Sequence, residues 1–241
     1  MRQISEDIFC DATLFEMNIQ NLFLPNPYHK TPFLIIEDFL SKQECAFIAK
    51  EAYIDEDAQQ AEVKSMLLDS VVNPGVNKTI RKTLIHKPSS LFEEIYTKRF
   101  LNSQGKIEEY FAAPLTTSTP LQVLAYKQGD FYIKHSDDSN EIIDKKGQTI
   151  GFQLVAPQRR ITTVAFGTSH KSYADSNRYY FDGGELVFNY LYYKDGTQVS
   201  LKPKAGDMIA FPSNPLFSHE VKVVEEGFRL TLVQWHNAII T

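Results

Sequence analysis

The chain has 241 residues, of which 43% are hydrophobic and 23% charged, and its formal net charge is -5. This length suits one substantial core, and the acidic balance argues against the basic surface with which proteins bind nucleic acid or anionic membranes. No apolar run approaches the roughly 18 residues that cross a bilayer. The two cysteines have no metal-binding spacing, which favours a reduced, cytoplasmic setting.

The chain is predicted to form a single domain with three parts. Residues 1–32 are interpreted as an N-terminal extension, because a Pro-Asn-Pro sequence at 25–27 interrupts any regular element. Residues 33–120 are interpreted as a helical support region. Residues 121–236 form the predicted core, because apolar residues there change from helical spacing to a period of two.

Two helices are predicted in the support region. The first begins after Ser41, because Glu44 stands three residues later and completes a capping-box pattern ahead of apolar residues at helical spacing. The second begins near Ser89, and Gly105 is a candidate break within it.

Eight short strands are predicted from residue 121 onward, several of them separated by glycine-containing turns. They are Leu121–Tyr126, Phe131–Asp137, Ile161–Phe166, Glu185–Tyr190, Val199–Lys202, Asp207–Phe211, His219–Val224 and Phe228–Trp235. This series predicts a mainly β fold with flanking helices and a jelly-roll, cupin-like core.

The sequence His135-Ser136-Asp137, with His219 some eighty residues later, contains a candidate metal site. Residues two apart on a strand share a face, and two imidazoles with one carboxylate are a known ligand set for Fe(II). His135 and Asp137 alone are a weak signal. His219 strengthens it, because Val221 and Val223 share its face and indicate burial; a core histidine bonded to a backbone carbonyl is the alternative.

Arg229 lies on a strand whose two faces are both largely apolar. A guanidinium buried there needs a partner, since an unpaired buried charge costs several kcal/mol. A bound carboxylate is one such partner, with the hydroxyl of Thr231 beside it. A structural ion pair with an acidic residue elsewhere in the chain is the alternative.

An ordered series of motifs from Phe33 to Trp235 resembles the iron(II)/2-oxoglutarate-dependent dioxygenases, in particular their prolyl-4-hydroxylase-like branch. The motifs are Phe33-Leu34-Ile35-Ile36-Glu37-Asp38-Phe39-Leu40-Ser41, Tyr126-x-x-Gly129-x-x-Tyr132-x-x-His135-x-Asp137, Arg160-Ile161-Thr162-Thr163, Gly183-Gly184-Glu185-Leu186-Val187-Phe188, Pro203-x-Ala205-Gly206-Asp207, Phe211-Pro212-Ser213, His219-x-Val221 and Gly227-x-Arg229.

This resemblance implies a double-stranded β-helix that uses Fe(II), 2-oxoglutarate and O2. It implies that His135, Asp137 and His219 bind the iron, and that Arg229 binds the distal carboxylate of 2-oxoglutarate. Tyr126 stands where the family often places a tyrosine hydroxyl on that carboxylate, and Thr231 is a further candidate.

The predicted reaction is hydroxylation of an unactivated C–H bond in a small molecule such as an amino acid. The polar segments 138–159 and 170–182 are predicted to be long loops at the barrel mouth. His170 and Trp235 are the candidate substrate contacts. A prolyl-type hydroxylase of proteins, a cupin-type metalloenzyme without an oxoacid and a non-catalytic binding barrel are the alternatives.

Overall fold

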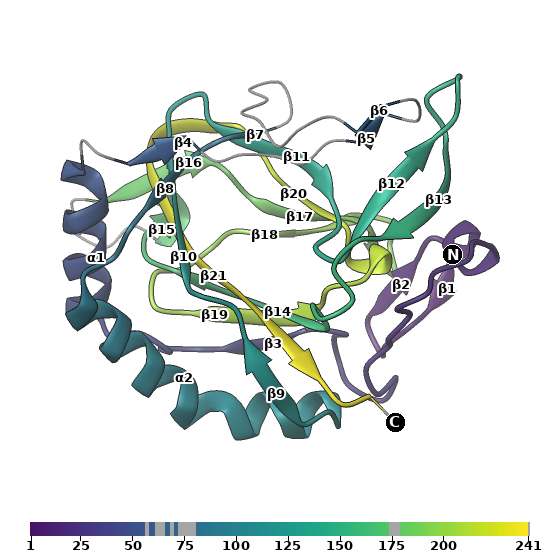
Figure 1. Cartoon of the computed structure of the whole chain (residues 1–241), viewed down its shortest axis with the longest axis horizontal. Helices are drawn as coiled ribbons and strands as arrows, with labels where there is room; N and C mark the ends of the chain where they lie inside the picture. Colours follow the sequence, from purple (N-terminus) through teal and green to yellow (C-terminus); the bar gives the residue numbers. More distant parts are fainter. Residues whose placement is uncertain (56–57, 61–65, 68–69, 72–80, 174–178, 241) are drawn as a thin grey trace.

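The protein is built from two curled β-sheets that face each other, with two helices along the outside of the larger sheet (Figure 1). The computed structural model describes residues 1–55, 58–60, 66–67, 70–71, 81–173 and 179–240. This is the mainly β architecture with flanking helices that the sequence predicts. No helix in these described ranges is long and apolar enough to cross a membrane.

In the described part of the chain, the first sheet has the order β1-β2-β17-β20-β11-β7, with β18 beside β17. Its strands are β1 (Arg2–Gln3), β2 (Ile8–Cys10), β7 (Arg81–Lys82), β11 (Phe131–His135), β17 (Leu186–Tyr193), β18 (Gln198–Leu201) and β20 (His219–Val221).

The second sheet has the order β3-β19-β14-β21-β10-β8-β4; in addition, β9 and β16 pair with β21, and β15 pairs with β16. Its strands are β3 (Leu34–Ile36), β4 (Gln59–Gln60), β8 (Leu84–His86), β9 (Leu115–Ser118), β10 (Gln122–Lys127), β14 (Ile161–Phe166), β15 (Ser169–His170), β16 (Tyr180–Gly183), β19 (Met208–Pro212) and β21 (Val224–Ala238).

The remaining elements lie outside these two sheets. They are the helices α1 (Lys42–Ile54) and α2 (Ser90–Phe111), the hairpin strands β12 (Ser139–Ile143) and β13 (Thr149–Leu154), the short pair β5 (Met66–Leu67) and β6 (Ser70–Val71), and the 3-10 turns η1 (Ala12–Glu16), η2 (Lys171–Tyr173) and η3 (Pro215–Phe217).

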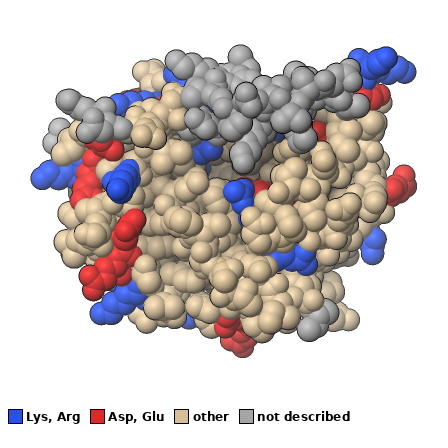
Figure 2. All heavy atoms as spheres, in the orientation of Figure 1, with Lys and Arg blue, Asp and Glu red and all other residues tan. Residues whose placement is uncertain are grey.

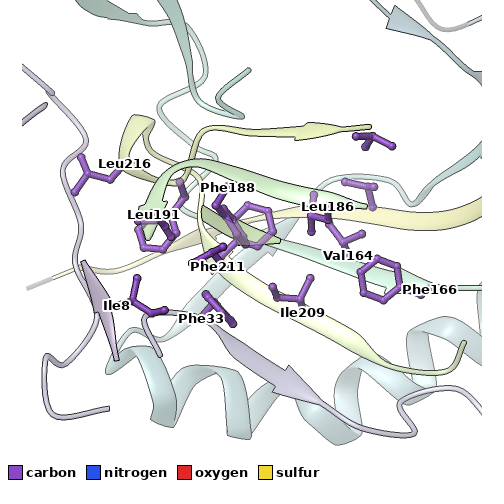
Figure 3. Packing of buried hydrophobic residues seen from close by; sticks show 14 of the residues in the cluster. Ile8, Phe33, Val164, Phe166, Leu186, Phe188, Leu191, Ile209, Phe211 and Leu216 are labelled. Atoms are coloured by element: carbon purple, nitrogen blue, oxygen red, sulfur yellow. The ribbon is translucent and has the colours of Figure 1, made fainter. Parts of the chain in front are cut away.

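The period-two pattern of the core strands divides their side chains between two apolar layers. On β19, Ile209 and Phe211 point between the sheets, while Met208 and Ala210 point toward the helices. Figure 3 shows the layer between the sheets, where Phe188 packs edge-on against Phe211 with ring centroids 5.1 Å apart. One strand therefore supports both the barrel interior and the helical layer.

Both predicted helices are present, but the second is not divided. In α1 the Ser41 side chain accepts from the Glu44 N–H, and Glu44 accepts from the Ser41 N–H, which confirms the capping box. Helix α2 runs unbroken through Gly105, so the candidate break is wrong. Phe100 and Ile107 are buried on either side of it, and this packing outweighs the roughly 1 kcal/mol that a helical glycine costs.

Each of the eight predicted core strands is present, as β10, β11, β14, β17, β18, β19, β20 and β21. The strand predicted at His219–Val224 is shorter, because β20 pairs with its neighbours only as far as Val221 before the chain turns into β21. Val223 is consequently 49% exposed, which corrects the prediction that it shares the buried face of His219.

The segment predicted to be a loop at 138–159 is largely the hairpin β12–β13. Its turn is closed by Asp144, whose Oδ1 accepts from the backbone N–H groups of Lys146 and Gln148, each at 2.8 Å. Glu141 joins it to the barrel by accepting from Lys134 at 2.7 Å. The hairpin buries few side chains, so its sequence carries no strong alternation of apolar and polar residues.

The predicted N-terminal extension contributes to the barrel. Strand β2 pairs with β17, and Ile8 and Cys10 are fully buried in the layer between the sheets. On the face of the molecule seen in Figure 2, positive and negative side chains are interspersed, with no large field of one sign. This distribution agrees with the mildly acidic composition.

Candidate metal centre

His135 and His219 face each other on neighbouring strands of the first sheet. They are directly paired in the register of β11 and β20, and their ring centroids lie 4.4 Å apart. A β-bulge between Tyr132 and His135 aligns this pair. Strand pairing thus brings together two histidines that stand more than eighty residues apart.

Asp137 completes the group from just beyond the end of β11. Its Oδ1 lies 3.9 Å from Nε2 of His135, and its Oδ2 lies 3.9 Å from Nε2 of His219. One ligand atom from each residue falls within 4.8 Å of the other two. His135 and Asp137 were predicted to share one face of a strand, but β11 ends at His135, so Asp137 joins the group from the segment after the strand.

Hydrogen bonds orient all three side chains. Nδ1 of His135 contacts the Ile133 carbonyl at 2.9 Å, and Nδ1 of His219 contacts the Phe217 carbonyl at 3.0 Å. A carbonyl only accepts, so each Nδ1 carries the proton and each Nε2 keeps a free lone pair. Thr162 donates to Oδ2 of Asp137 at 2.7 Å.

The charge states also suit a divalent cation. Burial raises the pKa of Asp137, but His219, His135 and the Thr162 hydrogen bond outweigh this and lower it overall, so the carboxylate is ionised. Burial, with the neighbouring charge of His219, lowers the pKa of His135 to about 3. A neutral imidazole and an ionised carboxylate are the forms that bind metal.

Arg229 is the largest fully buried side chain in the described part of the chain. Its Nε donates to the Gly184 carbonyl at 2.7 Å, while its Nη1 is buried with no hydrogen-bond partner. Burial lowers its pKa to about 10, which still leaves it a cation at neutral pH. No carboxylate among the described residues lies within ion-pair distance, so the alternative of a structural ion pair finds no partner there.

The other two predicted co-substrate residues surround Arg229. Tyr126 is its cross-strand partner on β10, and the guanidinium carbon lies 5.0 Å from the centre of the Tyr126 ring. Thr231 is buried two residues along β21, on the same face. The second face of this strand packs against the helices through Leu230 and Leu232, so both faces meet protein, as predicted.

Sequence reasoning assigned no role to three further residues beside the metal group. Tyr132 stacks on His135 with ring centroids 3.6 Å apart, and the Arg81 guanidinium lies 4.6 Å from the Tyr132 ring centre. Arg159 lies 3.9 Å from the ring centre of Trp235, one of the two predicted substrate contacts. Tyr132 stands in a quoted motif three residues before His135, whereas no local signal marks either arginine.

His170, the other predicted substrate contact, lies apart from the metal group. It is 2% exposed, and its ring meets Phe181 edge-on at 5.7 Å. Phe181 in turn faces the Arg229 guanidinium, 5.8 Å away. His170 therefore lies behind the wall of the Arg229 pocket.

The part of the chain that contains the metal group and Arg229 also identifies the family. Residues 121–237 match the model of the 2OG-Fe(II) oxygenase superfamily. This chain is a 2OG-Fe(II) oxygenase. As an enzyme of this superfamily it uses Fe(II), 2-oxoglutarate and O2, which sets aside the non-catalytic barrel and the cupin-type enzyme without an oxoacid.

Solved structures of 2OG-Fe(II) oxygenases share its fold. A Pseudomonas putida prolyl-4-hydroxylase is 20% identical, with a TM-score of 0.59 over 85% of this chain and 92% of that one. A Trichoplax adhaerens prolyl hydroxylase, in complex with a hypoxia-inducible factor peptide fragment, is 19% identical, with a TM-score of 0.56 over 85% and 83%.

A Burkholderia pseudomallei oxidoreductase of the 2OG-Fe(II) oxygenase family is 15% identical, with a TM-score of 0.50 over 85% of both chains. The sequence has no match among curated proteins. At these low identities the structural similarity shows a common fold and no more. The two facing sheets of this oxygenase are therefore the predicted double-stranded β-helix.

Proposed function

We propose that His135, Asp137 and His219 bind the Fe(II), and that Arg229 binds the distal carboxylate of 2-oxoglutarate. One observation carries the second assignment: the buried Arg229 guanidinium has an unpartnered Nη1 and no carboxylate of the described chain beside it. A guanidinium buried in this way is stable only when an anion pairs with it. The dianionic co-substrate supplies that anion.

The neighbouring side chains prepare the iron site. The carbonyls of Ile133 and Phe217 fix the two imidazoles so that Nε2 of each points at the same position. Thr162 holds the carboxylate of Asp137, and Ser213 holds the Thr162 hydroxyl at 2.8 Å. Such outer hydrogen bonds set the direction and basicity of metal ligands.

The co-substrate pocket excludes water on several sides. Tyr126 and Phe181 place aromatic rings against the Arg229 guanidinium, and the Gly184 carbonyl holds its Nε. In this low-dielectric setting the guanidinium binds a carboxylate more strongly than it would in water. Thr231 and the Tyr126 hydroxyl are the further groups that we assign to the same carboxylate.

We assign to this site the hydroxylation of an unactivated C–H bond in a small molecule such as an amino acid. Iron with bound 2-oxoglutarate and O2 supplies the oxidant, and the products are succinate, CO2 and the alcohol. The carboxylate of Asp137 occupies the position that related halogenases leave to a halide, which favours hydroxylation. Trp235 and Tyr132 are the assigned walls of the substrate pocket, and substrate contact by His170 stays a prediction.

A second candidate is hydroxylation of a peptidyl residue such as proline. The observation that favours it is the shared fold with two prolyl hydroxylases, one of them bound to a peptide fragment. Gain of one oxygen atom by a protein, detected by intact mass, would support this candidate. Gain of one oxygen atom by a free metabolite would support the first.

Anaerobic titration with Fe(II) and 2-oxoglutarate tests the metal and co-substrate assignments. We expect the weak visible charge-transfer band of the chelate in the wild type and its loss in His219→Ala. Arg229→Ala should retain iron but need far more 2-oxoglutarate to produce the band. An unchanged 2-oxoglutarate requirement in Arg229→Ala would reject the co-substrate assignment.

A further inference from the structure

Arg81 is a second buried arginine that lacks a partner in the described chain. Its side chain is 8% exposed, and its Nε is buried with no hydrogen-bond partner. Its neighbour Lys82 pairs with Asp130 at 2.8 Å, whereas no described carboxylate lies within ion-pair distance of Arg81. Its guanidinium lies over the face of the Tyr132 ring, 4.6 Å from the ring centre. A ring face does not neutralise a buried charge.

Arg159 is only partly satisfied. Its Nη1 donates to the backbone carbonyl of Asp137 at 3.0 Å, and its guanidinium covers the ring of Trp235. Its Nε is buried without a partner, and no described carboxylate pairs with it. The adjacent Arg160 differs, since its guanidinium donates to the side chain of Asn21.

Both arginines flank the metal group. Arg81, Tyr132 and His135 form a stack in that order, because the phenol ring lies between the guanidinium and the imidazole. Arg159 contacts the metal group at a different residue, because its Nη1 donates to the backbone carbonyl of Asp137. Arg159 thus contacts a residue of the metal group directly, and Arg81 contacts the ring that stacks on His135.

The charges of the loaded site leave these two arginines uncompensated. The ferrous ion and dianionic 2-oxoglutarate cancel each other. Arg229 and Asp137 carry one charge each, of opposite sign, and the imidazole of His135 is neutral. Neither Arg81 nor Arg159 forms an ion pair with a carboxylate of the described residues, so we look to the substrate for their anionic partner.

We propose that the substrate of this oxygenase carries a carboxylate, and that Arg81 and Arg159 bind it while its C–H bond faces the iron. This inference rests on the proposed function. The carboxylate belongs either to a free acid, such as an amino acid, or to an acidic peptide. Planar guanidinium groups match carboxylate oxygens in geometry as well as charge.

The test uses the full chain with Fe(II), saturating isotopically labelled 2-oxoglutarate and O2. Molecules extracted from the cells that contain this protein are separated into retained and unretained fractions on an anion exchanger at about pH 11, where amino groups are neutral and amino acids are retained through their carboxylates. Labelled succinate reports the turnover that each fraction stimulates. We expect stimulation by the retained fraction. Peptidase treatment of that fraction abolishes the signal if the carboxylate belongs to a peptide and spares it if the substrate is a free acid.

Variants connect the charge requirement to the two arginines. Arg81→Gln and Arg159→Gln should each raise the half-saturating amount of the retained fraction by about ten- to a hundredfold, the range for losing a charged hydrogen bond. Arg81→Lys should fall between wild type and Arg81→Gln, because it keeps the charge. Arg99→Gln is the matched control, since Arg99 pairs with Glu44 on the outer helices.

Stimulation by the unretained fraction alone, or by neither fraction, would overturn the proposal. Equal response of wild type, Arg81→Gln and Arg159→Gln to the retained fraction would overturn it as well. The charge-transfer band with Fe(II) and 2-oxoglutarate is measured in parallel. Its presence shows that the proposed function stands even where the inference about the substrate fails.

Discussion

Two groups in the described residues place histidine beside more than one acidic or histidine side chain, and they differ in which ring nitrogen carries the proton. In the first, His135 and His219 each direct Nδ1 at a backbone carbonyl, so that both Nε2 lone pairs converge beside Asp137. Neutral nitrogen lone pairs and an ionised carboxylate at one point form a ligand set.

In the second group, His170 lies near the carboxylates of Asp182 and Glu185, at 3.5 and 3.7 Å from Nε2. Here the backbone N–H of Ser172 donates to Nδ1 at 3.1 Å, so the ring proton belongs on Nε2 and faces the acids. In this arrangement Nε2–H of His170 points toward the two carboxylates, so neither ring nitrogen has a free lone pair for a metal.

Both groups contain histidine and carboxylate side chains but differ in which ring nitrogen is protonated, so residue types alone do not define a metal site. A backbone group two residues away decides which ring nitrogen is free: a carbonyl before His135 and His219, an N–H after His170. Among the described residues, only the first group brings three ligand atoms together. The predictions below test this comparison.

The largest effect is expected for iron binding by matched histidine variants. His135→Ala should weaken Fe(II) binding by more than about a hundredfold, beyond the range of outer hydrogen-bond changes. His170→Ala should bind Fe(II) as the wild type does. Anaerobic calorimetric titration with Fe(II) measures both. Equal losses in the two variants would mean that the second group also contributes to the metal site.

A smaller effect is expected from the hydroxyl that holds Asp137. Thr162→Val removes the 2.7 Å hydrogen bond to the carboxylate and should weaken Fe(II) binding by about ten- to a hundredfold. Thr163→Val is the matched control, because the Thr163 hydroxyl bonds His236 on the opposite face of β14. If both valine variants bind Fe(II) equally, the orientation of Asp137 does not depend on Thr162.

Gly184 lies against Arg229, and a side chain there should disturb the co-substrate pocket. It has φ +59°, and an added Cβ would lie 2.9 Å from Cδ of Arg229. We expect Gly184→Ala to raise the half-saturating concentration of 2-oxoglutarate about tenfold, measured by the charge-transfer band, because Arg229 must move.

Gly147→Ala in the hairpin turn is its control. Gly147 also has positive φ, but an added Cβ meets nothing within 4 Å. It should cost about 1 kcal/mol of stability without changing the 2-oxoglutarate requirement. A matching rise in both variants would attribute the effect to backbone strain alone.

The last prediction extends the comparison to His236, a buried histidine whose partners are hydroxyls. Ser118 and Thr163 bond its two nitrogens at 2.7 and 2.8 Å, and burial lowers its pKa to about 3. Between these two pKa values, His236 is protonated in the unfolded chain but neutral in the folded chain. Stability should fall as pH drops below about 6.5, by up to about 1.4 kcal/mol per pH unit until about pH 3.

His236→Gln should remove this contribution and reduce the slope of unfolding free energy against pH, while His135, whose pKa is also lowered to about 3, keeps its own contribution. Urea unfolding at several pH values in that window measures the slope of each protein. An identical slope in the variant would show that His236 is protonated in the folded state as readily as in the unfolded chain.

The sequence by itself determined the core strands and helix starts. Period-two alternation marked β10, β11, β14 and β17 to β21, and the Ser41 capping box marked α1, because such signals depend on neighbours within a few residues. It also identified His135, Asp137, His219 and Arg229 as candidates, through residue type and through an ordered resemblance. The structure brings the first three together and buries the fourth.

Only the tertiary structure decided features whose partners are distant in the chain. Arg81 reaches Tyr132 through pairing of β7 with β11, and Arg159 reaches Trp235 through packing beside β14, so neither is marked locally. The hairpin at 138–159 and the continuity of α2 past Gly105 likewise depend on long-range contacts. Local sequence patterns predict strands and helix starts. The partners of buried charged side chains depend instead on which strands pair in the folded chain.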